Sequence, residues 1–347
     1  MKKFISVILC FCFAISMTVN VAATDIIDDT TNYLLEIVEN PTVGSVGGEW
    51  TILGLARSNR EVPQKYFEDY YKNVEEYVKE CNGVLHKRKY SEYSRLIIAL
   101  TSIGKDPKNV AGYNLLLPLS DYEKTLVQGI NGAIWALIAL DCGNYAIEPN
   151  PDVKVLATRE MYIKKILSSQ LEGGGWSLTG SGESDPDVTA MALVALSNYQ
   201  DSDNVKAATE KALICMSQKQ SPDGGFSSWG ITNIESTAQM IVALCELGID
   251  IDDPRFVKNG NTLLDNMSSY YEKGKGFRHT PQGETNLMAT EQALYALVAL
   301  ERAKSGNKSL FDMSDVILGT IDYSDRTPIK NSLIFMFSQL IFGESKW

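Results

Sequence analysis

Three stretches of this chain repeat one another, and no other feature of the sequence constrains the fold as strongly. The copies are residues 170–196, 220–244 and, more weakly, 274–297. Each has a glycine-rich turn with one aromatic residue, then a threonine, then an Ala-Leu pair in an apolar segment. The threonines Thr189, Thr237 and Thr290 lie 48 and 53 residues apart, which is typical of a repeated two-helix unit. The repeat therefore predicts a stacked or closed array of helical hairpins.

Apolar residues recur at helical spacing in six pairs of segments. The pairs are 26–39 with 50–57, 65–80 with 91–103, 115–126 with 130–141, 158–169 with 186–199, 204–218 with 234–247, and 256–271 with 286–303. The second segment of each pair is richer in Ala, Gly and Leu, whereas the first is more amphipathic. Small residues let helices approach closely, so we expect an all-α (α/α)6 toroid with the second helices inside. The glycine turns should then gather at one face, and Pro118 should break the 115–126 segment.

The first 23 residues are expected to be a signal peptide. Lys2 and Lys3 precede an apolar run over 4–17, and small residues precede a cleavage point after Ala23. The run is short for a membrane span, so we expect a secreted or cell-surface protein with no transmembrane span after cleavage. Removing both lysines changes the formal charge from −11 to −13, with acids spread along the chain. Nucleic acid is therefore not expected as a partner.

The toroid is expected to span residues 24–305, followed by a tail over 306–347. In the tail, Thr327 and Pro328 could begin a helix over 329–342 that is apolar almost all round. That extra helix would either close over the toroid or bind a partner or a membrane surface. The four cysteines after the signal peptide fall at opposite helix ends, so we expect free, mostly buried thiols.

The glycine turns carry a second pattern, Gln-x-x-x-Gly-x-aromatic, from Gln170 to Trp176 and from Gln220 to Phe226. It resembles the repeat of squalene cyclases and protein prenyltransferases. The third copy has no Gln but keeps the aromatic Phe277. The resemblance covers residues 48–300 and implies the same toroid, in which Gln ties helix ends together and the aromatic residue packs against the turn. It therefore implies structural roles for these five residues.

Two further resemblances concern exported toroids. Residues 234–244 are similar to the helical domain of the cobalamin carriers intrinsic factor and transcobalamin, which makes a corrinoid one candidate ligand. Those carriers close their ligand between the toroid and a β-rich domain, and we expect no such domain after Leu300. Residues 43–50 and 288–293 resemble a group of exported bacterial toroid proteins. No cofactor is predicted.

The segment Asp185-Pro-Asp187-Val-Thr-Ala resembles the DxDDTA motif of class II terpene cyclases. By position Asp187 would be the proton donor and Asp185 its neighbour, although Val188 replaces the third acid. Alkene protonation requires a strongly acidic donor in a dry cavity. A structural interpretation competes: Asp185 would be an N-cap and Asp187 would favour the first helical turn through its charge.

Other acidic and aromatic residues should lie at the same face of the ring. The candidate ligand-binding residues are Glu49, Trp50, Tyr93, Glu183, Trp229, Glu235, His279, Glu284 and Glu291. Paired carboxylates beside aromatic residues would also suit sugar binding or glycoside hydrolysis. Solvated acids at a rim are the simpler interpretation.

Metal chemistry is not predicted. The chain has only two histidines, His86 and His279, and the adjacent pair Asp141-Cys142 lacks the Asp-x-Cys spacing of a prenyltransferase zinc site. Our leading hypothesis is therefore an exported, noncatalytic toroid that binds a ligand or partner at the glycine-turn face. The ligand would be apolar, a corrinoid or a glycan, and the partner a cell-surface protein. One alternative is a class II terpene cyclase-like enzyme acting on an isoprenoid, and another is a carbohydrate-active toroid.

Overall fold

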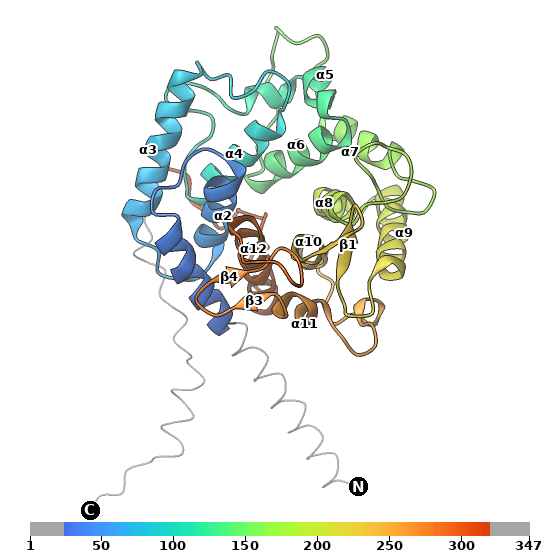
Figure 1. Ribbon diagram of the computed structural model, residues 1–347. Helices are drawn as coiled ribbons and strands as arrows, with labels where there is room; N and C mark the ends of the chain where they lie inside the picture. Colours follow the sequence, from blue (N-terminus) through green and yellow to red (C-terminus); the bar gives the residue numbers. More distant parts are fainter. Residues whose placement is uncertain (1–23, 320–347) are drawn as a thin grey trace, which may run out of the picture.

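Six helices form a closed inner ring in the computed structural model, which describes residues 24–319. They are α2 (Trp50–Arg57), α4 (Ser91–Ser102), α6 (Ile130–Cys142), α8 (Pro186–Leu196), α10 (Ile234–Glu246) and α12 (Leu287–Lys304). Each inner helix packs against the next, and α12 returns to pack against α2 (Figure 1). The ring is closed, so the predicted all-α (α/α)6 toroid is confirmed. The predicted signal peptide and the predicted helix over 329–342 lie outside the described residues.

The outer helices are less regular than the inner ones. They are a helix over 24–37, α3 (Gln64–Glu80), α5 (Tyr122–Thr125), α7 (Arg159–Ser168), α9 (Asp203–Lys219) and α11 (Leu263–Ser268). The segment that contains Pro118 breaks as predicted, into two 3-10 turns on either side of the short α5. The prediction of one helix over 256–271 is wrong. Asn259 and Gly260 adopt positive φ there, which ends helical geometry, and α11 begins only after its N-cap Thr262.

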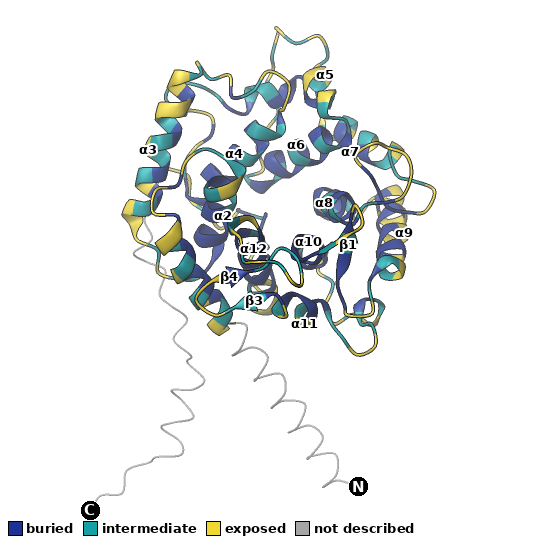
Figure 2. Cartoon of the chain, viewed as in Figure 1, coloured by how far each residue is buried: buried dark blue, intermediate teal, exposed yellow. Residues whose placement is uncertain are grey.

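The two layers pack closely because inner helices carry small residues. Figure 2 shows the inner helices largely buried, while α3 and α9 expose residues on their outer sides. Ala133, Ala136 and Ala139 of α6 are fully buried. At Gly132 any Cβ would collide with the backbone oxygen of Thr125, so this contact between layers requires glycine. Small inner residues therefore set the radius of the ring.

The glycine turns lead into the inner helices and include two short hairpins that periodicity did not predict. β1 (Phe226–Ser228) pairs with β2 (Ile231–Asn233), and β3 (Tyr271–Glu272) pairs with β4 (Gly276–Phe277). Each hairpin lies at the start of an inner helix, α10 or α12, and both are on the same face of the ring (Figure 1). The hairpins therefore belong to one mouth of the toroid.

The repeated glutamines join neighbouring hairpins. Nε2 of Gln170 donates to the backbone oxygens of Gly174 and Ala208, and Nε2 of Gln220 donates to those of Gly224 and Phe256. Each side chain thus ties its own glycine turn to the next outer segment.

The repeated aromatic side chains are buried beside the same turns. The indole of Trp176 donates to the backbone oxygen of Ile166 at 2.7 Å, and Phe226 and Phe277 are almost fully buried. Each ring therefore fills the space under its own turn.

The segment after α12 crosses the opposite end of the ring. Since an outer helix returns the chain between consecutive inner helices, the inner helices all end on this side. The N–H of Phe311 donates to the carboxylate of Glu246 at the end of α10, and the N–H groups of Met313 and Gly319 donate to the backbone oxygens of Cys142, at the end of α6, and Gly104, just after α4. The Arg57 guanidinium, at the end of α2, donates to three carbonyl oxygens and to Asp315. This segment, residues 309–319, therefore covers the end of the ring away from the glycine turns.

The four cysteines within residues 24–319 are free thiols. Cys142, Cys215 and Cys245 are buried free thiols, and Cys81 is a partly exposed one. Within residues 24–319 no single helix is long and apolar enough to cross a membrane, although a pair over 122–128 and 130–142, bent by 120°, passes on length and composition.

Candidate functional site

A cavity of about 410 Å³ lies inside the ring at the mouth with the glycine turns. Its described lining residues come from five inner helices and the loops above them: Trp50, Trp135, Asp187, Met191, Ser228, Trp229, Ile231, Asn233, Glu235, Gln239, His279, Met288 and Gln292. Five of the candidates expected from the sequence are among them, namely Trp50, Asp187, Trp229, Glu235 and His279. The structure therefore brings these five to one place.

Residues of the three repeats enter the cavity in register. The first helical turns contribute Asp187, Glu235 and Met288, and the residues one turn later contribute Met191, Gln239 and Gln292. Residues four apart on a helix lie on the same face. The equivalence of the first three positions was visible in the sequence. The second row, Met191, Gln239 and Gln292, was not predicted. The signal that could have found it is the spacing of four residues from each position of the first row, Asp187, Glu235 and Met288.

The bottom of the cavity is aromatic. The rings of Trp50 and Trp135 lie 5.2 Å apart between centroids, and Trp50 lies 6.0 Å from Tyr295. These three residues and Phe311 line a further small hollow beneath the cavity. Since Phe311 belongs to the segment across the far end of the ring, the cavity opens at the glycine-turn mouth. Sequence reasoning did not single out Trp135 or Tyr295.

A carboxylate pair lies at the start of α8. Asp185 is the N-cap, since Oδ1 accepts from the N–H of Val188 at 3.0 Å, and its Oδ2 accepts from the hydroxyl of Ser228 at 2.5 Å. Asp187 lies in the first turn and lines the cavity, and its Oδ1 is buried without a hydrogen-bond partner. Burial, with smaller contributions from the charges of Asp185 and Glu235, raises the pKa of Asp187 to about 6, and the hydroxyls of Ser236 and Ser228 oppose that increase. Capping thus occupies Asp185 and leaves Asp187 toward the cavity.

Glu235 and His279 form the second polar pair of the cavity. Nδ1 of His279 lies 2.8 Å and 2.9 Å from the two carboxylate oxygens of Glu235. Burial raises the pKa of Glu235, and the hydrogen bond from His279 opposes that increase. His279 lies in the loop after β4, and its own backbone oxygen accepts from the N–H of Ile234, which fixes its position. The pair therefore joins the loop after the β3–β4 hairpin to the start of α10.

Two candidate acids are buried outside the cavity, under the turn before α2. Glu49 is paired with Arg95 at 2.9 Å and accepts from the N–H of Gly44. Glu291 accepts from the N–H of Gly47 at 2.7 Å and from the hydroxyl of Thr51. Their contacts hold the turn against α4 and α12.

The other three candidates also lie outside the cavity lining. The hydroxyl of Tyr93 accepts from the N–H of Leu85 at 3.0 Å and donates to the backbone oxygen of Gly83. Glu183 is 91% exposed and paired with Lys219, and Glu284 is exposed. Tyr93 therefore holds a loop, and the two glutamates are solvated.

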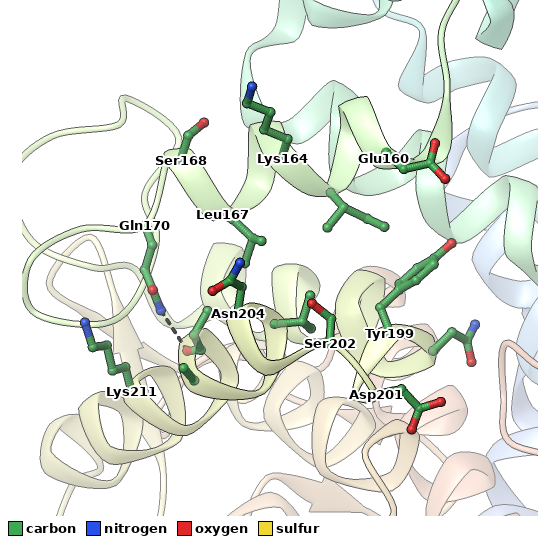
Figure 3. A pocket seen from close by; sticks show the side chains of 15 residues that line it. Glu160, Lys164, Leu167, Ser168, Gln170, Tyr199, Asp201, Ser202, Asn204 and Lys211 are labelled. Carbon is green, nitrogen blue, oxygen red and sulfur yellow. Dashed lines mark hydrogen bonds between the residues drawn. The ribbon is translucent and has the colours of Figure 1, made fainter.

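A larger groove of about 990 Å³ runs along the outer wall between α7 and α9. Figure 3 shows Glu160, Lys164, Asn204 and Lys211 around it, all exposed. The amide of Gln170 on its floor already bonds to the backbone oxygen of Ala208. The groove lacks the buried carboxylates and the aromatic floor of the central cavity, so its size alone does not make it the better candidate.

Among the described residues, no group of three or more His, Cys, Asp and Glu side chains is placed to hold a metal ion.

Comparisons with known proteins agree with the ring architecture. The family model for the squalene-hopene cyclase C-terminal domain matches residues 180–313. The solved structure of Candida albicans protein geranylgeranyltransferase-I complexed with GGPP is similar at a TM-score of 0.54, with 14% identity, over 85% of this chain and 96% of that chain. Unsaturated glucuronyl hydrolase from Bacillus sp. GL1 has a TM-score of 0.47 and 12% identity, over 84% of this chain and 98% of that chain. No curated protein matches the sequence. Similarity at this level concerns the fold, and this chain is an α/α toroid of the squalene cyclase and protein prenyltransferase type.

Proposed function

We propose that this protein is an exported, noncatalytic binding protein whose central cavity takes a small ligand with both an apolar face and polar groups. The observation that carries the proposal is the composition of that cavity. An aromatic floor of Trp50 and Trp135 faces a mouth with Asp187, Glu235 and His279. Ligand sites are typically concave, largely apolar and equipped with a few placed polar groups.

The size of the cavity and the cover over its far end support a small ligand. A volume of about 410 Å³ is near the lower end of the range of roughly 300–1,000 Å³ usual for ligand pockets. Phe311 underlies the floor, so a ligand would enter and leave through the glycine-turn mouth. A complete corrinoid, with its macrocycle and side chains, is too large for this space. A corrinoid would therefore need a second domain to enclose it.

The cyclase alternative is less well supported by the geometry. Burial raises the pKa of Asp187 to about 6, which makes it a weaker acid than an ordinary aspartic acid. Alkene protonation needs a stronger donor and a cavity without groups that would take the proton back. Here Glu235 and His279 line the same cavity, and Trp229 at the mouth is 74% exposed. These groups favour binding over carbocation chemistry.

A carbohydrate ligand is the second candidate. Trp229 offers an exposed indole at the mouth, and Gln292 places a side-chain amide in the wall. Aromatic faces with adjacent amides suit a sugar ring, which has an apolar face and hydroxyl edges.

Native mass spectrometry of the purified protein with corrinoids, oligosaccharides, isoprenoids and small amines tests the proposal. We expect one class to stay bound, and Trp135→Ala to remove that binding because it takes away half of the aromatic floor. The matched control is Leu178→Ala, an exposed apolar residue of a glycine turn outside the cavity lining. Binding that survives Trp135→Ala would contradict the cavity assignment. Turnover of an isoprenoid that disappears in Asp187→Asn would overturn the noncatalytic assignment.

A further inference from the structure

We propose that the ligand of the central cavity is an organic cation, held through a methylated ammonium group between carboxylates and indole rings. The proposal rests on the function proposed above for this cavity and narrows its ligand class. It is carried by the charges, the aromatic side chains and the state of the polar groups in the lining.

The charges in the lining are one-sided. Asp187 and Glu235 are the acids, and no Lys or Arg is among the described lining residues. His279 is the basic group of the lining, and its Nδ1 is engaged with Glu235. Asp185, directly behind Asp187, adds a further negative charge to this wall and receives one hydroxyl hydrogen bond, from Ser228. A cationic ligand would supply the missing positive charge.

The aromatic side chains match the same ligand. Trp50, Trp135 and Trp229 all line the cavity, and the faces of Trp side chains attract cations more strongly than those of other aromatic residues. Met191 and Met288 complete the apolar part of the wall with polarizable thioethers. Methylated ammonium groups are recognised by such combinations of rings and carboxylates, because their charge is spread over an apolar surface.

The polar groups favour a cation over a neutral polyol. Nδ2 of Asn233 donates to the backbone oxygen of Ile231, and Nε2 of Gln239 donates to Gln292 and Tyr295. These donors are already engaged within the protein and offer little to the oxygens of a sugar. By contrast, Oδ1 of Asp187 is buried without a hydrogen-bond partner, and the hydroxyls of Ser236 and Ser228 only partly offset the effect of burial on this carboxyl. The two acids are thus the groups of the lining that a positive charge would complement, whereas the side-chain amides of Asn233 and Gln239 already donate within the protein.

Binding of a cation is expected to depend on pH. The pKa of Asp187 is raised to about 6 by burial and by the neighbouring charges of Asp185 and Glu235, and a bound cation would favour its ionised form. Affinity should therefore rise between pH 5 and pH 7, with proton release on binding near pH 6. Protonation of Glu235, which is paired with His279, would act in the same direction at low pH. The variant Asp187→Asn separates its share from that of Glu235.

Isothermal titration with choline and its uncharged carbon isostere, 3,3-dimethylbutan-1-ol, tests the proposal on the unmodified protein. We expect choline to bind at least tenfold more tightly than the isostere. Added salt should weaken the binding of choline. Asp187→Asn should reduce the affinity for choline about tenfold and leave that for the isostere unchanged. Glu183→Gln, an exposed acid near the mouth and outside the lining, is the matched control.

The outcomes separate this inference from the proposed function. An isostere or an oligosaccharide that binds in a Trp135-dependent manner, while choline does not, would overturn the cation and leave a binding protein. Equal affinity for choline and the isostere would also overturn it. Failure of every probe class, including corrinoids and isoprenoids, would overturn the proposed function itself. The comparison of choline with its isostere needs no variant, so it stands even if Asp187→Asn fails to fold.

Discussion

Thr290 Oγ1 accepts a hydrogen bond from the backbone N–H of Phe277 at 2.9 Å, across 13 residues of the third glycine turn. The first repeat makes the same bond, from the N–H of Trp176 to Thr189 Oγ1, also at 2.9 Å. In the second repeat the threonine instead donates to the side chain of Asn266. The repeated threonine therefore fastens the first and third turns to their inner helices, and in the second repeat it joins α10 to α11.

Replacing this threonine should destabilise the toroid. Thr189→Val keeps the shape of the side chain but leaves the buried N–H of Trp176 without an acceptor, and we expect a loss of about 1–3 kcal/mol in the free energy of unfolding. Thr179→Val, on the exposed part of the same turn, should change it by less than about 0.5 kcal/mol. Urea unfolding measures both, and equal effects would contradict the role given to Thr189.

Two glycines with the same backbone conformation should differ in their tolerance of alanine. Gly224 and Gly230 have φ of +87° and +79°, so alanine is strained at both. At Gly224 a Cβ would also collide with the backbone oxygen of Thr262, whereas nothing lies within 4 Å at Gly230. We expect Gly230→Ala to lower unfolding free energy by about 1 kcal/mol and Gly224→Ala by about 2–4 kcal/mol. Matching losses would show that the contact with Thr262 is unimportant.

The ring was predictable because its cause is repeated in the sequence. Glycine turns, small inner residues and paired helical segments recur, and each recurrence strengthens the same interpretation. The hairpin β1–β2 was not predictable in this way, because its strands are three residues long and its turn has Trp229 at a φ of +51° rather than a residue that favours this conformation. The error in 256–271 has a different cause, since Asn259 and Gly260 do favour positive φ, but the apolar pattern on either side of them hid this local turn.

The candidate site was predictable in part, since the sequence pointed to Asp187, Glu235, Trp50, Trp229 and His279 but not to Trp135 or to the residues one turn after Asp187 and Glu235. Sequence alignment of the repeats finds the equivalence of Asp187 and Glu235, but it cannot tell which acids point into the ring. Glu291 is one helical turn from the lining residue Met288, yet it lies under the turn before α2, because Gly47 and Thr51 supply its donors. Trp135 comes from a helix outside the three clear repeats, so only closure of the ring brings it beside Trp50.

Glu291 should make stability depend on pH. Burial is the largest cause that raises its pKa, to about 7, with a smaller contribution from the charge of Glu49. The native state then binds the proton more tightly than the unfolded chain does, so stability falls as pH rises from about 4.5 to about 7. We expect Glu291→Gln to remove up to about 3 kcal/mol of this fall, since its amide oxygen still accepts from Gly47.

Guanidinium unfolding at pH 5 and pH 8 measures this effect. Asp187 and Glu235 have raised pKa values too, so part of the slope should remain in Glu291→Gln. Glu284→Gln, at an exposed position, should leave the slope as it is in the unmodified protein. A slope that Glu291→Gln does not reduce would mean that this carboxyl titrates alike in the folded and unfolded chain.

The segment across the far end of the ring should depend on Arg57. Its side chain is 2% exposed, pairs with Asp315 at 2.7 Å and donates to the backbone oxygens of Ser309, Leu310 and Asp312. Asp315 keeps its ion pair with Arg302 when Arg57 is replaced, but the three backbone oxygens lose their donor, and we expect Arg57→Ala to lower the free energy of unfolding by about 2–4 kcal/mol. Because Arg57 bonds directly to this segment, hydrogen exchange in Arg57→Ala should become faster at residues 309–319 before it does in the inner helices.

The exposed pair of Lys65 and Asp69, 2.6 Å apart on α3, is the control for Arg57. Both positions lose one ion pair on replacement by alanine, but solvent screens the pair on α3, so Lys65→Ala should cost less than about 1 kcal/mol. A small loss in Arg57→Ala, with unchanged exchange over 309–319, would mean that apolar contacts of Phe311 and Met313 hold the segment without the guanidinium. A large loss of exchange protection that is confined to residues 309–319 would instead show that Arg57 holds this segment across the end of the ring away from the cavity mouth.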